Sequence, residues 1–363
     1  MKITFLLPYA GMHGGIRVVA IYAQLLRDRG HQITVISVAK NRLSLRHKLR
    51  QVISKKTWLP IENEQGGTYF EKDDPSWIVL SHAGPITEND VPDSDVIIAT
   101  WWKTAEWAHR LGPSKGIKVY FCQGYETHDI KYRKRVEATY FLPIKKICVS
   151  EWVRKKIEHL TGLDDQETLQ NGVDLKQFYC STKVVRDRRC FGFLFSDEAT
   201  KGSDIIIEAL ELAKAQNPLI KAIAFGSSRP SKRIELPSWI EFYENPPQEF
   251  IREIYSRCTA WIFGSRAEGF GLPILEAMAC KTPVIATRAG AAPDLVLGSC
   301  GYLIPVEDPV EMANKIIEVS KLNSVAWAQK SRAAYEVACH NDWESSCSRL
   351  VDILSDLLKI SRL

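Results

Sequence analysis

The first half of the chain alternates between short apolar runs and stretches with helical spacing. Ile3–Leu7 is an apolar run without helical period, and a proline ends it. In Ile16–Asp28 the apolar residues recur on one helical face, and the next strand is predicted over Gln32–Val38. Three further strands are predicted at Asp95–Thr100, Lys118–Cys122 and Lys146–Ser150. Strands that alternate with helices form a parallel sheet with right-handed crossovers.

A second series of strands and helices begins at Phe191–Ser196. Ser203 is predicted to be the N-cap of a helix that ends near Gln216. The later elements are predicted at Ile220–Phe225, Gln248–Arg257, Ala260–Phe263, Pro273–Cys280 and Pro283–Ala286. The tail, Asn323–Ile360, is predicted to be helical with no strand after it.

The two series predict two α/β domains joined by the polar and basic segment Asp174–Arg189. We place the first domain at residues 1–175, the second at 176–340, and a terminal helix at 341–363 that packs back on the first domain. A chain of 363 residues suits two domains of average size. Doubly wound sheets bind ligands at the carboxyl ends of their strands, so two such domains facing each other are expected to form a cleft.

Composition favours a globular protein in the cytoplasm. Hydrophobic residues make up 45% and charged residues 25% of the chain, which is typical of a protein with a buried core. No apolar run reaches the ~18 residues that cross a bilayer, and the first residues do not resemble a signal peptide. The nine cysteines include no CxxC pair, which favours reduced thiols over disulfides or a zinc site. The net charge of +5 does not imply a nucleic-acid partner.

The strongest chemical signal is the segment 268–279, which follows the apolar run Ala260–Phe263. Pro273 stands where a helix would begin, a position at which its missing N–H costs nothing. Gly269 and Gly271 let the backbone approach a ligand closely. The free N–H groups of the first helical turn then form an anion site that suits a diphosphate.

Two glutamates belong to this segment. Glu276 lies about one turn into the predicted helix, where its carboxylate can accept two hydrogen bonds from a ribose diol. Glu268 lies on the loop, where it can meet the hydroxyls of a sugar. The alternative is a glycine-containing turn with one glutamate on a solvated helix face, but the strand, loop and helix context favours a ligand site.

Segment 265–286 resembles the donor-site signature of retaining family-four glycosyltransferases with the GT-B fold. Three other segments resemble further motifs of that family in the family's order: Gly14-Gly15, Asn171–Asp174 and Lys201-Gly202. The resemblance implies two facing Rossmann-like domains. It also implies transfer of a hexose from a nucleotide-diphosphate sugar to a glycan or lipid-linked acceptor, with retention of the anomeric configuration and without an obligatory metal.

The resemblance implies roles for individual residues. Glu276 would hold the ribose, Glu268 would touch the transferred sugar, and Lys201 would bind phosphate. The backbone of the loop would cradle the diphosphate at Gly269, Phe270, Gly271 and Leu272. Gly14 and Gly15 would let N–H groups approach the donor phosphates or the acceptor.

The absence of a metal fits the residue pattern. A sugar-diphosphate bond that breaks leaves negative charge, and Lys201 with a helix N-terminus can stabilise that charge in place of Mg²⁺. The Asp-x-Asp sequence of the chain is Asp93-Ser94-Asp95, which stands in a proline-containing turn before a strand. We interpret it as part of that turn.

The chain departs from the family in two places. Many members carry an arginine five residues before the lysine, where this chain has Ser196, so a cation is missing unless Arg266 or Arg229 supplies it. Many members also place a histidine near the reacting centre, and the corresponding residue here is Gln123. Two residues can take over that polar role: Glu126 and His128.

A basic stretch at residues 40–58 contains seven Lys or Arg residues and no acidic residue. Its leucines, valine and isoleucine recur at helical spacing, and Trp58 closes it. This pattern suits an anionic membrane surface, and the enzyme would then be peripheral on the inner face of the cytoplasmic membrane. The alternative is a solvated segment whose leucines pack on the domain.

Two other functions remain open. A catalytically weak partner subunit that binds a glycan or another transferase would explain Ser196 and Gln123, whereas an intact set of Glu268, Lys201 and Glu276 argues against it. A nicotinamide dehydrogenase or a sugar-nucleotide epimerase is a third interpretation. The lack of a GxGxxG sequence argues against the dehydrogenase.

Overall fold

The computed structural model describes residues 1–11, 13–39, 68–71, 74–127, 129–180, 182, 184–230 and 233–361. The basic stretch 40–58 and His128 lie outside the described residues. The chain divides into two compact units. The first comprises Met1–Phe121, Asp129–Lys146 and Ile353–Leu363, and the second comprises Cys122–His128 and Ile147–Asp352. The domain boundaries expected at residues 175 and 340 stay predictions.

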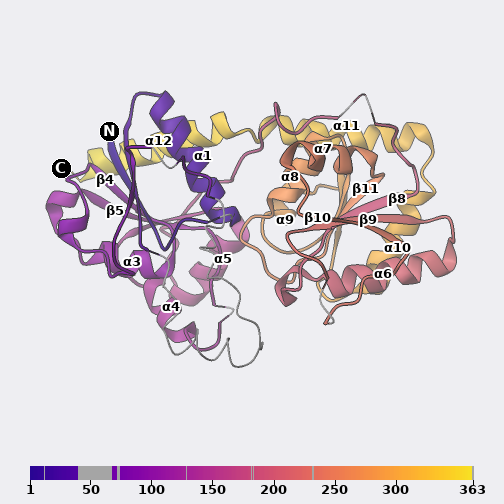
Figure 1. Cartoon of the computed structure of the whole chain (residues 1–363), viewed down its shortest axis with the longest axis horizontal. Helices are drawn as coiled ribbons and strands as arrows, with labels where there is room; N and C mark the ends of the chain where they lie inside the picture. The colour runs from indigo at the N-terminus through magenta and orange to yellow at the C-terminus, as the bar shows by residue number, and fades with distance from the viewer. Residues whose placement is uncertain are drawn as a thin grey trace, which may run out of the picture. The chain divides into compact units, whose positions relative to one another are not determined.

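The sheet that begins at the N-terminus has seven strands in the order β3-β2-β1-β4-β5-β6-β7 (Figure 1). Its strands are β1 Lys2–Leu7, β2 Gln32–Ser37, β3 Trp77–Val79, β4 Val96–Ala99, β5 Ile117–Cys122, β6 Lys145–Cys148 and β7 Glu167–Thr168. The pairs β1–β2, β1–β4, β2–β3 and β4–β5 are parallel. The helices are α1 Gly14–Asp28, α3 Trp102–His109, α4 Arg133–Tyr140 and α5 Glu151–Thr161.

Helix α1 begins at Gly14, two residues before the start that the apolar pattern predicts. The carbonyl of His13 accepts hydrogen bonds from the backbone N–H groups of Ile16 and Arg17, both at 3.0 Å. Gly14 and Gly15 therefore form the first turn of the helix. Because glycines have no side chains to contribute to an apolar pattern, the hydrophobic periodicity could not include these two residues in the predicted helix.

The second sheet has six strands in the order β10-β9-β8-β11-β12-β13, and its pairings are parallel. Its strands are β8 Cys190–Leu194, β9 Lys221–Gly226, β10 Ile240–Glu244, β11 Ala260–Phe263, β12 Val284–Thr287 and β13 Gly301–Ile304. The helices that follow β8 are α6 Ser203–Gln216, α7 Gln248–Arg257, α8 Leu272–Ala279, α9 Ala292–Leu295, α10 Pro309–Ser320, α11 Ser324–His340 and α12 Trp343–Ile360. Two doubly wound parallel sheets confirm the predicted fold class.

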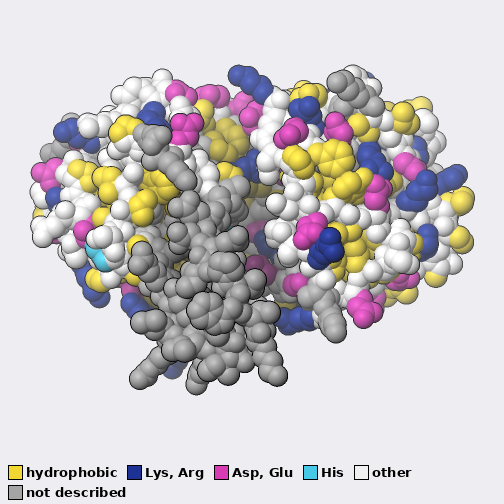
Figure 2. All heavy atoms as spheres, viewed as in Figure 1, with side chains coloured by type: hydrophobic (Ala, Val, Ile, Leu, Met, Phe, Trp, Pro, Cys, Tyr) yellow, Lys and Arg dark blue, Asp and Glu magenta, His cyan; other side chains and the backbone are white. Residues whose placement is uncertain are grey.

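Helices cover both faces of the six-stranded sheet. Figure 1 shows α6 and α10 on one side and α7, α8 and α11 on the other, and α6 packs directly on α10. Phe191, Phe193 and Ile262 of the central strands belong to the core cluster on the α6 and α10 side. Burial of each such side chain stabilises the fold by about 1.5–3 kcal/mol. On the face that Figure 2 draws, Lys and Arg side chains are interspersed with Asp and Glu over this unit.

The start of α6 corrects one prediction. Gly202 is the N-cap, in the left-handed region at φ +67°, and Ser203 is the first helical residue. The hydroxyl of Ser203 accepts a hydrogen bond from the backbone N–H of Ser196 at 2.9 Å. The serine therefore fixes the loop that enters the helix rather than capping the helix itself.

Candidate functional site

The strand order of the second sheet reverses between β8 and β11. After β8 the chain adds β9 and β10 on one side, and it then crosses to β11 on the other side. Phe193 of β8 lies opposite Ile262 of β11, so the two strands end next to each other. Doubly wound sheets bind ligands outside the carboxyl ends of the strands at such a reversal. The loops after β8 and β11 are therefore the expected ligand site of this unit.

Glycines let these two loops touch. A Cβ on Gly202 would lie 2.0 Å from the carbonyl oxygen of Gly264, a separation that real side chains do not tolerate. The left-handed φ of Gly202 adds a second reason for glycine there. Beyond this contact the backbone N–H of Arg266 donates to the carbonyl of Thr200 at 2.8 Å. The loop that carries Lys201 is thus fixed against the loop that carries Glu268.

The loop after β11 turns sharply into α8. Gly271 is the N-cap at φ +94°, and a Cβ on it would meet the ring of Phe263 at 2.9 Å. Leu272 and Pro273 are the first two helical residues, so the proline takes a position where no N–H is needed. Phe270 is buried, and its carbonyl accepts a hydrogen bond from the backbone N–H of Ala291 at 2.8 Å. The helix N-terminus is therefore held in a defined direction.

Lys201 and Glu268 form an ion pair across the two loops. The ammonium Nζ lies 2.7 Å from the carboxylate Oε2, and their side chains are 30% and 19% exposed. The other oxygen, Oε1, accepts a hydrogen bond from the N–H of Gly269 at 3.3 Å. Sixty-seven residues separate the pair in sequence. The structure thus brings together two residues that the sequence assigned to neighbouring parts of a donor site.

The charge state of Lys201 follows from this pair. Burial by itself lowers the pKa of the ammonium, but the charge and the hydrogen bond of Glu268 outweigh it and raise the pKa above the usual lysine value. The side chain is therefore a cation at every pH near neutrality. An ammonium has three N–H donors, so the contact with Glu268 leaves capacity for phosphate oxygens.

Glu276 lies inside α8 and is buried. Its Oε2 accepts a hydrogen bond from the phenol of Tyr255 at 2.9 Å, and Tyr255 comes from α7 and is itself fully buried. A buried carboxylate needs such donors, because the loss of its hydration is costly. Tyr255 is a residue of this site that the sequence did not single out.

The cations proposed to replace an arginine at Ser196 are already paired. Arg266 donates to both carboxylate oxygens of Asp204, at 2.7 and 2.8 Å, and also contacts Glu307. These bonds, first of all those to Asp204, raise the pKa of Arg266 well above its usual value. Arg229 is largely exposed and pairs with Glu244 at 2.8 Å. Each of the two guanidinium groups is therefore paired with carboxylates, and that of Arg266 also donates to the carbonyl of Ala199, two residues before Lys201, at 2.6 Å.

The segment after β5 also reaches the loop of Glu268. A Cβ on Gly269 would lie 1.8 Å from the carbonyl oxygen of Gln123 and 3.3 Å from the Cα of Gly124. Glycine at 269 is thus required by the approach of two backbones. Glu126 follows in the same segment and is half-buried. The polar roles predicted for Gln123 and Glu126 stay predictions.

Ser150 is a second residue of this site that the sequence did not indicate. It is fully buried, its hydroxyl donates to the carbonyl of Gly269 at 2.7 Å, and it is the N-cap of α5. The same helix end receives Asp294, whose Oδ2 accepts from the N–H of Glu151 at 3.2 Å. Burial raises the pKa of Asp294 above its usual value. Nothing in the spacing of these residues predicts the contacts, since they join segments more than 100 residues apart.

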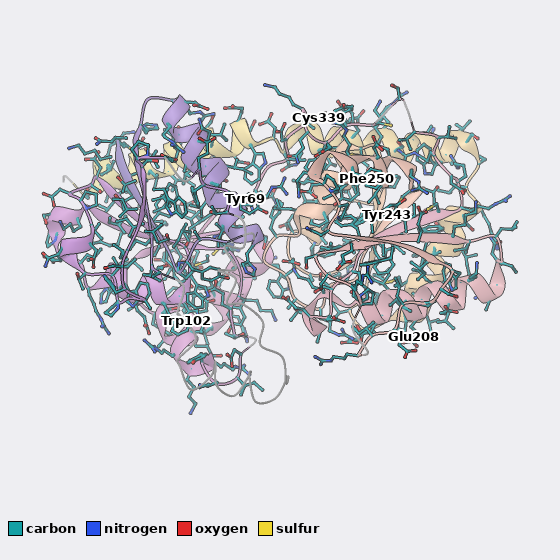
Figure 3. The ribbon with its side chains drawn as sticks, viewed as in Figure 1. Tyr69, Trp102, Glu208, Tyr243, Phe250 and Cys339 are labelled. Carbon is teal, nitrogen blue, oxygen red and sulfur yellow. The ribbon has the colours of Figure 1, made fainter. Side chains whose placement is uncertain are left out.

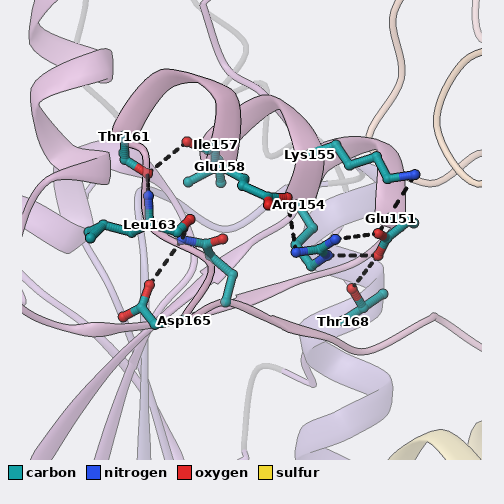
Figure 4. A network of polar contacts seen from close by, with 10 residues as sticks. Glu151, Arg154, Lys155, Ile157, Glu158, Thr161, Leu163, Asp165 and Thr168 are labelled. Atoms are coloured by element: carbon teal, nitrogen blue, oxygen red, sulfur yellow. Dashed lines mark hydrogen bonds and ion pairs between the residues drawn. The ribbon is translucent and has the colours of Figure 1, made fainter.

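A polar network stiffens α5. Figure 4 shows Arg154 between Glu151 and Glu158, with contacts of 2.6 Å and 3.1 Å to their carboxylates. Thr168 of β7 donates to Glu151 at 3.1 Å. The hydrogen bond from Arg154 is the main reason that the pKa of Glu151 is lowered. The network therefore anchors the helix whose N-cap holds the Gly269 loop.

Gly14 and Gly15 belong to the first unit, where they open α1 after β1. A Cβ on Gly14 would meet nothing within 4 Å, so packing within the described residues does not explain the glycine.

Asp93 and Asp95 of the Asp-x-Asp sequence contact Lys115 and the backbone N–H of Lys2. The described residues contain no group of three or more His, Cys, Asp or Glu side chains arranged to hold a metal ion. None of the helices in the described part is long and apolar enough to cross a membrane.

Comparison with known proteins adds sequence evidence. Residues 189–321 match the family described as "Glycosyl transferases group 1". An uncharacterised glycosyltransferase of Methanocaldococcus jannaschii is 29% identical over 48% of this chain and 49% of its own. The capsular polysaccharide biosynthesis glycosyltransferase CapM of Staphylococcus aureus is 24% identical over 57% of this chain and 60% of its own. The chain spans about half the length of the curated relatives that it matches.

Solved structures extend the likeness over the whole chain. HepE of Anabaena, determined in complex with UDP and glucose, has a TM-score of 0.73 at 18% identity and covers 98% of this chain and 100% of that one. At this identity the likeness shows the fold alone. The fold is the GT-B fold that the sequence predicted.

Proposed function

We propose that this chain, whose residues 189–321 match the group 1 glycosyltransferases, transfers a hexose from a nucleotide-diphosphate sugar to a glycan or lipid-linked acceptor with retention of the anomeric configuration. The observation that carries the proposal is the Lys201–Glu268 pair at the strand reversal of the second sheet. The capsular polysaccharide role in CapM's name supports a glycan acceptor.

In this proposal the diphosphate lies against the N-terminus of α8. The N–H groups of Gly271 and Leu272 and the ammonium of Lys201 donate hydrogen bonds to its oxygens. As the bond between the sugar and the diphosphate breaks, negative charge accumulates on the leaving group. Two preorganised positive groups stabilise that charge without a metal ion.

The two glutamates bind the two ends of the donor. Glu276 accepts hydrogen bonds from the ribose diol, with Tyr255 holding one of its carboxylate oxygens. Glu268 is joined to Lys201 and reaches the hydroxyls of the transferred sugar. The ion pair then couples the sugar end to the phosphate end, because one cation contacts both the carboxylate and the leaving group.

We place the enzyme in the cytoplasm, where nucleotide sugars are the available donors, and on the inner face of the cytoplasmic membrane through residues 40–58. The support for the second statement is the charge pattern of that stretch, which has seven cations and no acidic residue.

A nucleotide panel tests the proposal directly. The full chain is titrated with UDP, GDP, dTDP and ADP, and its thermal unfolding is followed. A nucleotide at 100 times its Kd stabilises the fold by ~2.7 kcal/mol. The nucleotide that binds then selects the donor for transfer assays, and proton NMR of the product reports the anomeric configuration. No shift with any nucleotide, or an inverted product, would contradict the proposal.

A specific observation favours a second function, a weakly active partner subunit. Ser196 removes a cation from the phosphate site, and Arg266 and Arg229 are already held by carboxylates. The substitution Ser196→Arg separates the two functions. A rise in transfer rate would show a working site that lacks a cation, whereas a rate that stays at background would favour the partner subunit.

A further inference from the structure

Residues at the carboxyl end of β4 hold an ammonium group against aromatic rings. The ring centroids of Trp101 and Trp102 lie 5.1 Å apart, and Lys103 Nζ lies 5.1 and 5.2 Å from them. Tyr132, next to α4, adds a third ring 5.7 Å from the same Nζ. Trp102, marked in Figure 3, is buried, whereas Trp101, Lys103 and Tyr132 are half-buried. Cation–π attraction therefore positions Lys103 at the surface of the first unit.

Trp101, Trp102, Lys103 and Tyr132 form what we call the aromatic–lysine cluster. The side chains in and around it carry more positive than negative charge. Arg135 forms a two-bond contact with Glu106, at 2.6 and 2.7 Å, and so its charge is balanced. Lys103, Lys131 and Lys134 form no ion pair with a carboxylate among the residues that the structure describes. Lys131 Nζ lies 5.1 Å from the ring of Tyr132, which adds it to the cluster.

The cluster lies where the first sheet reverses. The chain builds β2 and β3 on one side of β1 and then crosses to β4 on the other side. Trp101, Trp102 and Lys103 follow β4 closely and are thus at the carboxyl end of a strand next to that reversal, where doubly wound sheets bind ligands. The second sheet has its own reversal at Lys201 and Glu268. A transferase must bind an acceptor as well as a donor, and this first reversal is a candidate for the acceptor.

We infer that the aromatic–lysine cluster binds the acceptor through a phosphate group attached to its sugar, an inference that rests on the proposed transferase function. Lysine ammonium groups are effective point charges for phosphate, and two of them, Lys103 and Lys131, lie against the rings of the cluster. The electron-rich face of a tryptophan or tyrosine ring attracts the weakly positive C–H groups of a sugar ring. A sugar phosphate presents both kinds of group, one beside the other.

Calorimetric titration of α-glucose 1-phosphate and of inorganic phosphate into the full chain tests the inference. The titrations use a Lys201→Ala background, so that phosphate binding at the proposed donor site does not contribute. Lys103→Gln is expected to weaken binding of both probes about tenfold or more, the usual effect of losing a charge-assisted hydrogen bond. Trp101→Leu is expected to weaken binding of glucose 1-phosphate more than that of inorganic phosphate, because Trp102 and Tyr132 still hold Lys103.

Lys156→Gln is the matched control. Lys156 is exposed and its Nζ lies 5.5 Å from the ring of Trp152, so it repeats the lysine-on-tryptophan contact away from the cluster. Its substitution should leave both affinities unchanged. If Lys103→Gln fails to fold, the exposed pair Lys131→Gln and Lys134→Gln is used instead, with a smaller loss expected. Affinity that is unchanged in the folded variant, or no binding by the parent protein at millimolar probe, overturns the inference.

Two further arms identify the source of the phosphate. Glucose linked to a polyprenyl diphosphate in detergent should show the same loss in Lys103→Gln if the acceptor is lipid-linked. Vesicles of phosphatidylglycerol and phosphatidylcholine test a bare lipid surface. If Lys103→Gln reduces vesicle binding but not sugar-phosphate binding, the cluster is a membrane contact and the inference is wrong.

These titrations distinguish failure of the acceptor inference from failure of the proposed transferase function. If Lys201→Ala abolishes nucleotide binding and Lys103→Gln leaves sugar-phosphate affinity unchanged, only the acceptor inference is wrong. Loss of sugar-phosphate binding in Lys103→Gln, with no nucleotide bound by the parent protein, removes the proposed transferase function and leaves a sugar-phosphate site.

Discussion

The phenol of Tyr255 donates a hydrogen bond of 2.9 Å to Oε2 of Glu276, and both side chains are buried. The bond joins α7 to α8 and thereby fixes the orientation of the one carboxylate inside the helix that begins at the glycine loop. A ligand that approaches the N-terminus of α8 would meet a carboxylate that already has a defined rotamer. Less conformational entropy is then lost when the ribose binds.

Glu276→Gln is expected to weaken binding of the bare nucleotide as well as of the whole donor. A buried charge-assisted hydrogen bond that is lost costs roughly 1.5–3 kcal/mol, or about 10–100-fold in Kd. The Kd is measured by calorimetry with the nucleotide that stabilises the protein in the thermal-unfolding test. Glu249→Gln, an exposed change in α7, is the control and should bind normally. Unchanged nucleotide affinity in folded Glu276→Gln would exclude Glu276 from the site.

Tyr255→Phe is expected to act through Glu276. Removal of the phenol hydroxyl leaves the carboxylate less well held, so nucleotide affinity should fall by less than it does in Glu276→Gln. The double variant Tyr255→Phe with Glu276→Gln should lose no more affinity than Glu276→Gln alone, because Tyr255 acts only through the carboxylate that Glu276→Gln removes. Additive losses in calorimetry would mean that Tyr255 contributes by another route.

Lys201→Ala is expected to lower kcat about 10²–10³-fold while the fold remains intact, since a preorganised charge stabiliser is lost. Activity of the parent protein should survive EDTA, because the proposed site uses Lys201 in place of a metal. Lys176→Ala, an exposed lysine outside the site, is the control. Complete loss of activity in EDTA that Mg²⁺ or Mn²⁺ restores would refute the metal-free mechanism.

The sequence predicted the elements that are buried on both faces and missed those at the sheet edges. The predicted boundaries of α7 and β11 agree with the structure residue for residue. Strands β10 and β13 were not predicted. Both lie at the edges of the six-stranded sheet and are partly exposed, so they lack the continuous apolar run of a central strand.

The sequence also indicated individual residues of the site, but it did not indicate which residues they contact. Glu268 and Lys201 were both proposed, but their ion pair depends on β8 and β11 being neighbours, which no local pattern encodes. The role of Arg266 in phosphate binding stays a prediction, and its pairing with Asp204 and Glu307 was not expected because those residues come from distant segments. Local patterns predict what a residue can do, whereas tertiary contacts decide which partner it has.

Stability should depend on pH through Glu151. Its folded pKa is lowered, chiefly by the hydrogen bond from Arg154, below the ordinary value of 4.5. The carboxylate therefore stabilises the fold above about pH 4.5, and this contribution is lost as the pH falls through the lowered folded pKa. The gap in unfolding free energy between the parent protein and Glu151→Gln should be about 0.5–1 kcal/mol at pH 7 and smaller at pH 3. Urea unfolding measures it, with the exposed Glu208→Gln as control; a gap that widens at pH 3 would contradict the assignment.

Binding to anionic lipid is expected from the sequence of residues 40–58. Seven cations without an acidic residue repel one another in solution, and each gains roughly 1 kcal/mol near an anionic surface at low salt. The protein should sediment with phosphatidylglycerol vesicles, poorly with phosphatidylcholine vesicles, and dissociate as salt rises. Serine at Arg46, Lys48 and Arg50 should weaken vesicle binding and leave nucleotide affinity unchanged. If the parent protein does not sediment with anionic vesicles at low salt, residues 40–58 do not bind the membrane. The acceptor that we propose would then be a soluble glycan or a protein.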